Sequence, residues 1–132
     1  MVEYGETLEL PERDFSSVVE DVERFLEEEG FGVLTEINVQ ETLKKKLDVD
    51  VEKYRILGAC APDRAHKALQ AEKEIGLLLP CNVIVFEEDG VPVVGVMRPT
   101  QVMSLAGNDA LDEVAADVEE SMDNVLAKLE NS

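Results

Sequence analysis

Apolar residues recur at helical spacing near the start of the chain. Within residues 15–26, phenylalanine, valine and leucine side chains fall on one face of a helix. Two caps are available at its N-terminus, because Asp14 can accept a backbone hydrogen bond and Ser17–Glu20 fits a capping box. Gly30 suits the C-terminus, since glycine readily adopts the conformation that ends many helices. The pattern predicts a first helix that packs one face against the core.

A second long amphipathic helix is predicted near the C-terminus. Its apolar stripe extends over residues 111–129, and we expect it to face either the core or a dimer seam. Asn108 can cap this helix, and the acidic residues that follow suit the positive end of the helix dipole. Two shorter helices are predicted in between, over residues 41–47 and from Pro62 to a point before Gly76.

Five segments with alternating apolar or β-branched residues predict strands. Asp89-Gly90 lies between the last two and is a strong signal for a hairpin turn. Pro92 and Gly95 in the last segment predict a strand that is bulged or at the edge of the sheet, because proline cannot donate to a neighbouring strand. The predicted strands are residues 2–10, 31–39, 54–61, 81–88 and 91–97.

The elements follow the order β-α-β-α-β-α-β-β-α, which predicts a single α+β domain over residues 1–132. We expect a sheet of about five strands with helices mainly on one face. The other face would then be open, and an open apolar face invites a partner. A homodimer is therefore expected.

The charge of the chain limits its partners. Thirty acidic residues against twelve basic ones give a net charge of −18. Nucleic-acid binding requires basic groups that displace phosphate counterions, and the one basic run, Lys44-Lys45-Lys46, is typical of a solvated helix face. We expect neither nucleic-acid nor membrane binding, since every apolar run is also far shorter than the roughly 20 residues of a membrane span.

The N-terminal segment MVEYGETLELPE is acidic and lacks the basic and apolar regions of a signal peptide. A cytoplasmic location is therefore expected. Many acidic residues, only seven lysines and abundant valine and alanine further indicate a halophilic protein from a high-salt cytoplasm. Salt would there screen the self-repulsion of the chain.

Cys60 and Cys81 are the residues most suited to chemistry. Two cysteines and one histidine are too few for an ordinary structural zinc site, which takes four ligands. Cys60 is predicted just before a helix N-terminus, where backbone N–H groups favour a thiolate; Arg64 could add to this effect and Asp63 would oppose it. Burial as small apolar residues is the simpler interpretation of both cysteines.

Whether the two cysteines meet depends on the connection between their strands. If the helix from Pro62 is a full crossover, they lie at opposite sheet edges; if residues 76–80 run back along the sheet, they share one edge. His66 is predicted on the solvent face of its helix, although a position turned toward Cys60 would allow a Cys–His pair.

We expect a small pocket near Cys60–Pro62 and Leu79–Cys81. Methionine suits adaptable apolar packing, so Met97 and Met103 could also contribute to it, although burial in the core is their default role. The candidate lining residues are Cys60, Pro62, His66, Leu79, Pro80, Cys81, Met97 and Arg98.

Several motifs together resemble the DUF302 family. They are GAC-x-P-x-x-A from Gly58 to Ala65, IGLLLPCNVIVFE over residues 75–87, Arg98-Pro99, and Gly30-Phe31 followed by EINV. The resemblance covers roughly residues 12–130 and implies a compact α+β domain, often dimeric, without an established activity. Two positions depart from the family pattern, since Ala61 stands where a polar residue is usual and Arg98 where an acidic residue often precedes the proline.

Three functions remain open at this stage. The favoured one is a homodimeric binding or interaction module with the small pocket described above. The first alternative is a thiol-dependent redox or sulfur-handling protein in which Cys60 is the nucleophile and Cys81 the resolving thiol. The second is a soft-metal binder that uses both cysteines. The sequence does not identify a cofactor or ligand.

The excess of acidic residues predicts salt-dependent stability. We expect the melting temperature to rise by several degrees from low to multimolar KCl, because salt screens repulsion within a chain of net charge −18. Sucrose is the control, since it favours burial without screening charge. Equal melting temperatures in low and high KCl would contradict the halophilic interpretation.

Overall fold

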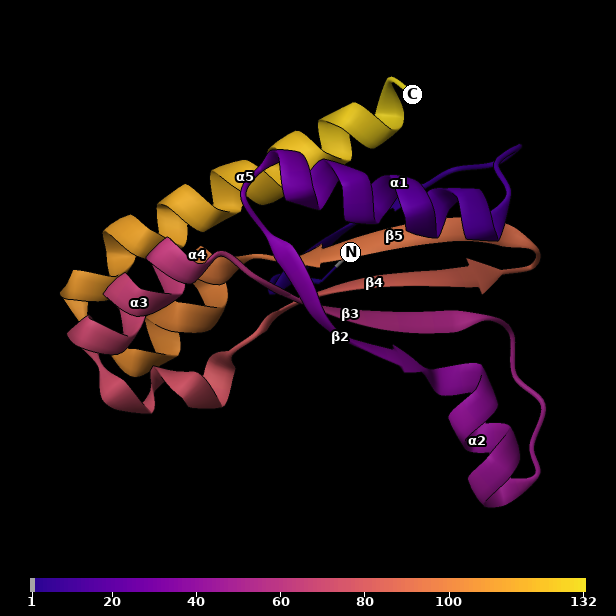
Figure 1. Cartoon of the computed structure of the whole chain (residues 1–132), viewed down its shortest axis with the longest axis horizontal. Helices are drawn as coiled ribbons and strands as arrows, with labels where there is room; N and C mark the ends of the chain where they lie inside the picture. The colour runs from indigo at the N-terminus through magenta and orange to yellow at the C-terminus, as the bar shows by residue number, and fades with distance from the viewer. Residues whose placement is uncertain (1) are drawn as a thin grey trace.

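A computed structural model describes residues 2–132 and shows one five-stranded sheet in the order β1-β5-β4-β3-β2, with every neighbouring pair antiparallel (Figure 1). The strands are β1 (Gly5–Glu9), β2 (Gly32–Asn38), β3 (Tyr54–Cys60), β4 (Cys81–Glu88) and β5 (Val91–Met97). The α-helices are α1 (Phe15–Glu28), α2 (Val39–Leu47), α3 (Pro62–Ala71), α4 (Pro99–Val102) and α5 (Asp112–Glu130), and the 3₁₀ helices are η1 (Lys73–Leu78), η2 (Met103–Ala106) and η3 (Asp109–Leu111). The predicted α+β class and element order are confirmed.

The caps follow from the local sequence. Asp14 is the N-cap of α1 and accepts a hydrogen bond from the backbone N–H of Ser17, which resolves the choice between the two predicted caps. Asn108 caps η3, and α5 begins at Asp112. The predicted helix after Pro62 is shorter than expected, because α3 ends at Ala71 and continues as the 3₁₀ helix η1.

The hairpin turn is as predicted, but the place of its second strand is not. Asp89 and Gly90 both have positive φ values, 52° and 82°, as a two-residue turn between antiparallel strands requires. The expectation that β5 is an edge or bulged strand was wrong, because β5 lies between β1 and β4. Pro92 is tolerated there because β1 ends at Glu9, opposite Val93, so the missing N–H of Pro92 falls beyond the end of that ladder. Gly95 leaves space for Ile84, whose Cγ1 would lie 2.8 Å from an added Cβ.

The long helices α1 and α5 cover one face of the sheet, as predicted (Figure 1). Their apolar stripes pack with alternate residues of the central strands to form the main core cluster, in which Leu57, Val83 and Val94 are fully buried. Burial of these stripes removes a large apolar area from water, which is the main stabilising contribution to such a domain.

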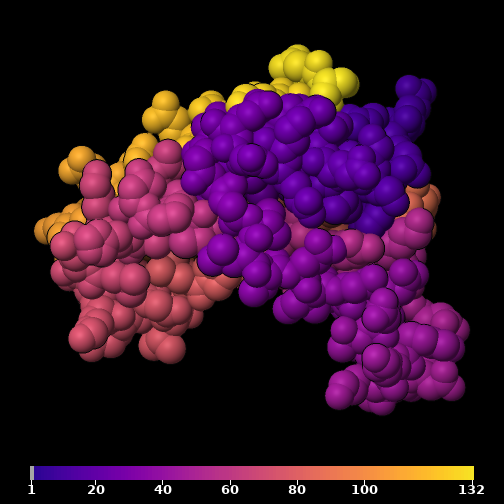
Figure 2. Space-filling model, viewed as in Figure 1, coloured from indigo at the N-terminus to yellow at the C-terminus, as the bar shows by residue number. Residues whose placement is uncertain are grey.

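A second, smaller core cluster lies beyond the end of the sheet. It joins α3 and η1 to η2, η3 and the first turns of α5 through buried residues such as Ala68, Ile75 and Met103. Helix α2 is different, because none of its residues is buried and it projects from the sheet on the side away from α1 and α5 (Figure 1). The sheet face between α2 and η1 is left uncovered, and a hollow is visible there in the space-filling view (Figure 2).

Gly58 on this open face provides a test of the packing. An alanine Cβ there would collide with the Thr35 hydroxyl and lie 2.9 Å from the Pro80 Cγ atom. We expect Gly58→Ala to lower the free energy of unfolding by about 1–3 kcal/mol, the usual cost of overpacking, when measured by urea denaturation. Gly32→Ala is the matched control, because no atom lies within 4 Å of its added Cβ. Equal stability losses in the two variants would contradict this packing.

Candidate functional site

The two cysteines lie on neighbouring strands at the same end of the sheet. Ala59 of β3 pairs with Cys81 of β4, so Cys60 is one residue beyond the position opposite Cys81. The connection through α3 and η1 therefore returns the chain to the same end of the sheet at which β3 finished. Strand spacing places the two Cα atoms about 6 Å apart. Both thiols are free.

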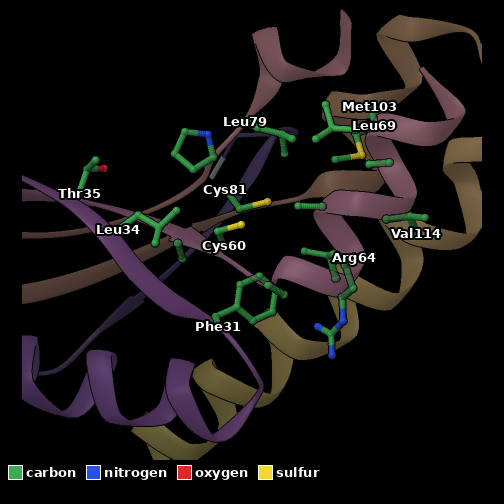
Figure 3. Close-up of a pocket in the computed structure, with 16 residues that line it drawn as sticks. Phe31, Leu34, Thr35, Cys60, Arg64, Leu69, Leu79, Cys81, Met103 and Val114 are labelled. Carbon is green, nitrogen blue, oxygen red and sulfur yellow. The ribbon is translucent and has the colours of Figure 1, made fainter. Parts of the chain in front are cut away.

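Both cysteine side chains point into one cavity at this end of the sheet (Figure 3). The cavity has a volume of about 360 Å³, which lies within the usual range for small-molecule sites. Almost all of its wall is apolar, and the side chains of Arg64 and Thr35 are its polar exceptions. Its lining residues are Phe31, Leu34, Thr35, Ala59, Cys60, Ala61, Arg64, Ala65, Ala68, Leu69, Leu79, Pro80, Cys81, Met103, Val114 and Val118.

The cavity occupies the seam between the two core clusters. Phe31, Ala59 and Val118 belong to the main cluster, whereas Ala68 and Met103 belong to the smaller one. A further pair of lining residues, Leu79 and Val114, packs against both clusters. The space exists because the two clusters meet only partially at this end of the sheet.

Arg64 lines the cavity, and its side chain is held in place by three neighbouring residues. Its guanidinium carbon lies 5.2 Å from the centre of the Phe31 ring, a cation–π arrangement. It donates a 2.7 Å hydrogen bond to the Ser121 hydroxyl and forms an ion pair with Asp117 at 3.3 Å. Helix α3 is thereby tied both to Phe31, which directly precedes β2, and to α5. The guanidinium is engaged with these partners, so it acts as a structural tie between elements.

Burial, and to a smaller extent the nearby Cys60 thiol, together raise the pKa of the Cys81 thiol to about 11. Cys81 is only 5% exposed, so desolvation of a thiolate is the larger cause. At neutral pH this side chain is therefore a protonated, apolar group. Cys60 is half-buried and lies two residues before the first residue of α3, as predicted from Pro62.

The structure brings together half of the predicted pocket residues. Cys60, Leu79, Pro80 and Cys81 all line the cavity. Pro62 and His66 do not, because the start of α3 turns them toward solvent, where both are exposed. His66 therefore matches its predicted solvent position.

Met97 and Arg98 also lie outside this cavity. Met97 lines a groove on the open sheet face, which it shares with Leu79 and Pro80. Arg98 forms a 3.0 Å ion pair with Glu6 and donates its backbone N–H to the Tyr4 carbonyl, so it fastens β1 to the end of β5. Met103, which the sequence placed near the pocket, does line the cavity.

Sequence reasoning missed the walls that distant segments supply. Phe31 was noted only as part of a motif, and Val114 and Val118 only as members of an apolar helix stripe. Leu34 and Thr35 adjoin a register shift in β2 that no local signal predicts. These residues meet the cysteines only through the tertiary fold.

Residues 2–132 contain neither a metal-ligand cluster nor a membrane-spanning helix. No cluster of three or more histidine, cysteine or acidic side chains is arranged to hold a metal ion in that range. None of the described helices combines the length and apolar character needed to cross a membrane.

Residues 6–129 match the family described as a domain of unknown function, DUF302. The chain belongs to the DUF302 family. It is similar to the solved crystal structure of an uncharacterized conserved DUF302 protein from Bacillus stearothermophilus, with 31% sequence identity and a TM-score of 0.88. That match covers 96% of this chain and 98% of the Bacillus chain. A comparison with curated proteins finds no match.

The two departures of this DUF302 domain from the family pattern now have positions in the fold. Ala61 is 3% exposed and lines the cavity, so the wall is apolar where the family resemblance leads us to expect a polar group. Arg98 is held by Glu6 away from the cavity. The first departure makes this cavity more apolar, whereas the second has no direct effect on it.

Proposed function

We propose that the domain is a non-enzymatic binding module whose cavity takes a small, mainly apolar molecule. The observation that carries the proposal is the cavity of about 360 Å³ at the seam of the two core clusters, with an almost wholly apolar wall. Transfer of an apolar ligand from water into such a space is favourable in proportion to the area it buries. The cysteine thiols contribute soft, weakly polar surface to this wall.

Several features favour binding over thiol catalysis. In the thiol alternative Cys81 is the resolving thiol, which attacks as a thiolate, and its raised pKa of about 11 disfavours that form. The single histidine, His66, is exposed on α3 and does not line the cavity. Arg64 is engaged by Phe31, Ser121 and Asp117. We propose that the protein carries out this binding role in a salt-rich cytoplasm, because salt screens the repulsion within a chain of net charge −18.

A neutral fluorophore tests the binding role. N-phenyl-1-naphthylamine fluoresces more strongly in apolar surroundings, and we expect saturable binding to the full chain. Ala65→Phe places a ring into the cavity and should weaken binding at least tenfold, because it occupies the ligand's volume. Ala127→Phe is the matched control, since Ala127 is exposed on α5 and lies outside the lining. Equal affinity of the two variants would refute the assignment.

We also propose that two copies of the chain pair through the open sheet face. This face carries a groove of about 600 Å³, in which the rings of Tyr54 and Phe86 stack 5.3 Å apart beside Ile84. Among the groove residues, all within the described range, Glu6 alone carries a carboxylate. In a chain of net charge −18, such a face lets two copies approach with little like-charge repulsion.

Two exposed leucines, one inside the groove and one outside it, allow the proposed interface to be tested. Leu77 lines the groove and is 88% exposed, whereas Leu105 is 80% exposed and lies outside it. We expect Leu77→Glu to convert a dimer into a monomer in light scattering coupled to gel filtration at high salt, because the added charge would be buried. Leu105→Glu should leave the dimer intact. A monomeric parent chain, or a dimer that survives Leu77→Glu, would reject this interface.

A further inference from the structure

Two thiols share the apolar cavity from adjacent strands. Cys60 and Cys81 line the same space, and their Cα separation of about 6 Å, from strand spacing, lies in the range that lets two sulfurs reach one another or a shared atom. The close-up shows both sulfurs directed into the cavity (Figure 3). A purely apolar ligand would need neither of them.

We propose that Cys60 and Cys81 together form a dithiol site for a soft, thiol-seeking atom that carries an apolar substituent, such as a trivalent organoarsenical. The soft atom would bridge the two sulfurs and its substituent would occupy the cavity. This inference rests on the proposed binding role of the same cavity and specifies its ligand chemistry.

The reaction needs no oxidant and leaves no charge behind. An arsenic(III) oxide bearing one organic group reacts with two protonated thiols, so that two As–S bonds form. The two S–H protons leave with the oxide oxygen as one water molecule, and arsenic stays trivalent. The product is neutral, which matches a cavity with an almost wholly apolar wall.

Hard or four-coordinate metal ions fit this site poorly. Zinc would require two ligands beyond the cysteines, and residues 2–132 hold no cluster of three or more metal-ligating side chains. Binding of a metal cation would also expel thiol protons, and burial of Cys81 opposes this because it raises the thiol pKa to about 11. A reaction that consumes protonated thiols avoids that cost.

The surroundings of the thiols select the substituent. Phe31, Leu79 and Met103 line the space that a substituent would occupy. Sulfur–aromatic and aromatic contacts with these side chains favour a planar apolar group. A phenyl substituent should therefore bind more tightly than an inorganic arsenic centre without one.

Phenylarsine oxide is the probe. We expect native mass spectrometry of the full chain to show one phenylarsenic group per chain with loss of one water, and a thiol titration to show both thiols consumed. Cys60→Ser and Cys81→Ser should each weaken binding at least 100-fold, because one thiol cannot chelate. Cys81→Ala replaces Cys81→Ser if the serine variant does not fold. An adduct that leaves a free thiol, one that bridges two chains, or equal affinity of a single-cysteine variant would overturn the dithiol site.

Two comparisons separate this proposal from the binding role itself. Fluorophore binding and phenylarsine oxide binding are first measured separately on the parent chain, because the fluorophore reports only the apolar space and the oxide requires both thiols. Ala65→Phe should then lose the preference for phenylarsine oxide over inorganic arsenite, because its ring fills the space for the substituent. A two-thiol adduct in a chain that never binds the fluorophore would refute the apolar role alone. Fluorophore binding without the adduct would refute the dithiol site alone.

Discussion

The antiparallel pairing of β3 with β4 is the constraint on which the rest of the structure depends. Because the chain must return to the same end of the sheet, residues 61–80 cannot cross its face and instead fold beyond its end as α3 and η1. That excursion is too small to have an independent core, so it packs against η2, η3 and the start of α5. The cavity and the neighbouring thiols are both products of this one return.

Charged side chains are almost absent from the two apolar spaces of the fold. Both apolar spaces, the cavity and the groove on the open face, are nearly free of charged side chains, although the chain carries a net charge of −18. Carboxylates are instead found where water or a basic partner can solvate them, as at Asp117 beside Arg64. Desolvation of a charge is costly, so an acidic chain can keep such surfaces only by excluding acid from them.

Local patterns predicted the elements but not the contacts between them. Periodicity and turn chemistry identified α1, α5 and the Asp89-Gly90 hairpin, because each depends on neighbours in the sequence. The interior position of β5 was missed, because its second partner is β1, at the other end of the chain. No local pattern near β5 indicates this pairing. The proximity of the cysteines was undecided for the same reason, since the direction of a connection is not encoded in its composition.

The register shift in β2 has a consequence for how copies of this domain can assemble. The edge strands of an open sheet present unpaired backbone groups that can template endless strand addition. In β2 the irregularity between Val33 and Thr35 interrupts the ladder. At the opposite edge β1 has only five residues, Glu6 and Glu9 among them. Neither border can be extended by a flat, regular strand. The fold thus resists fibre growth by strand addition.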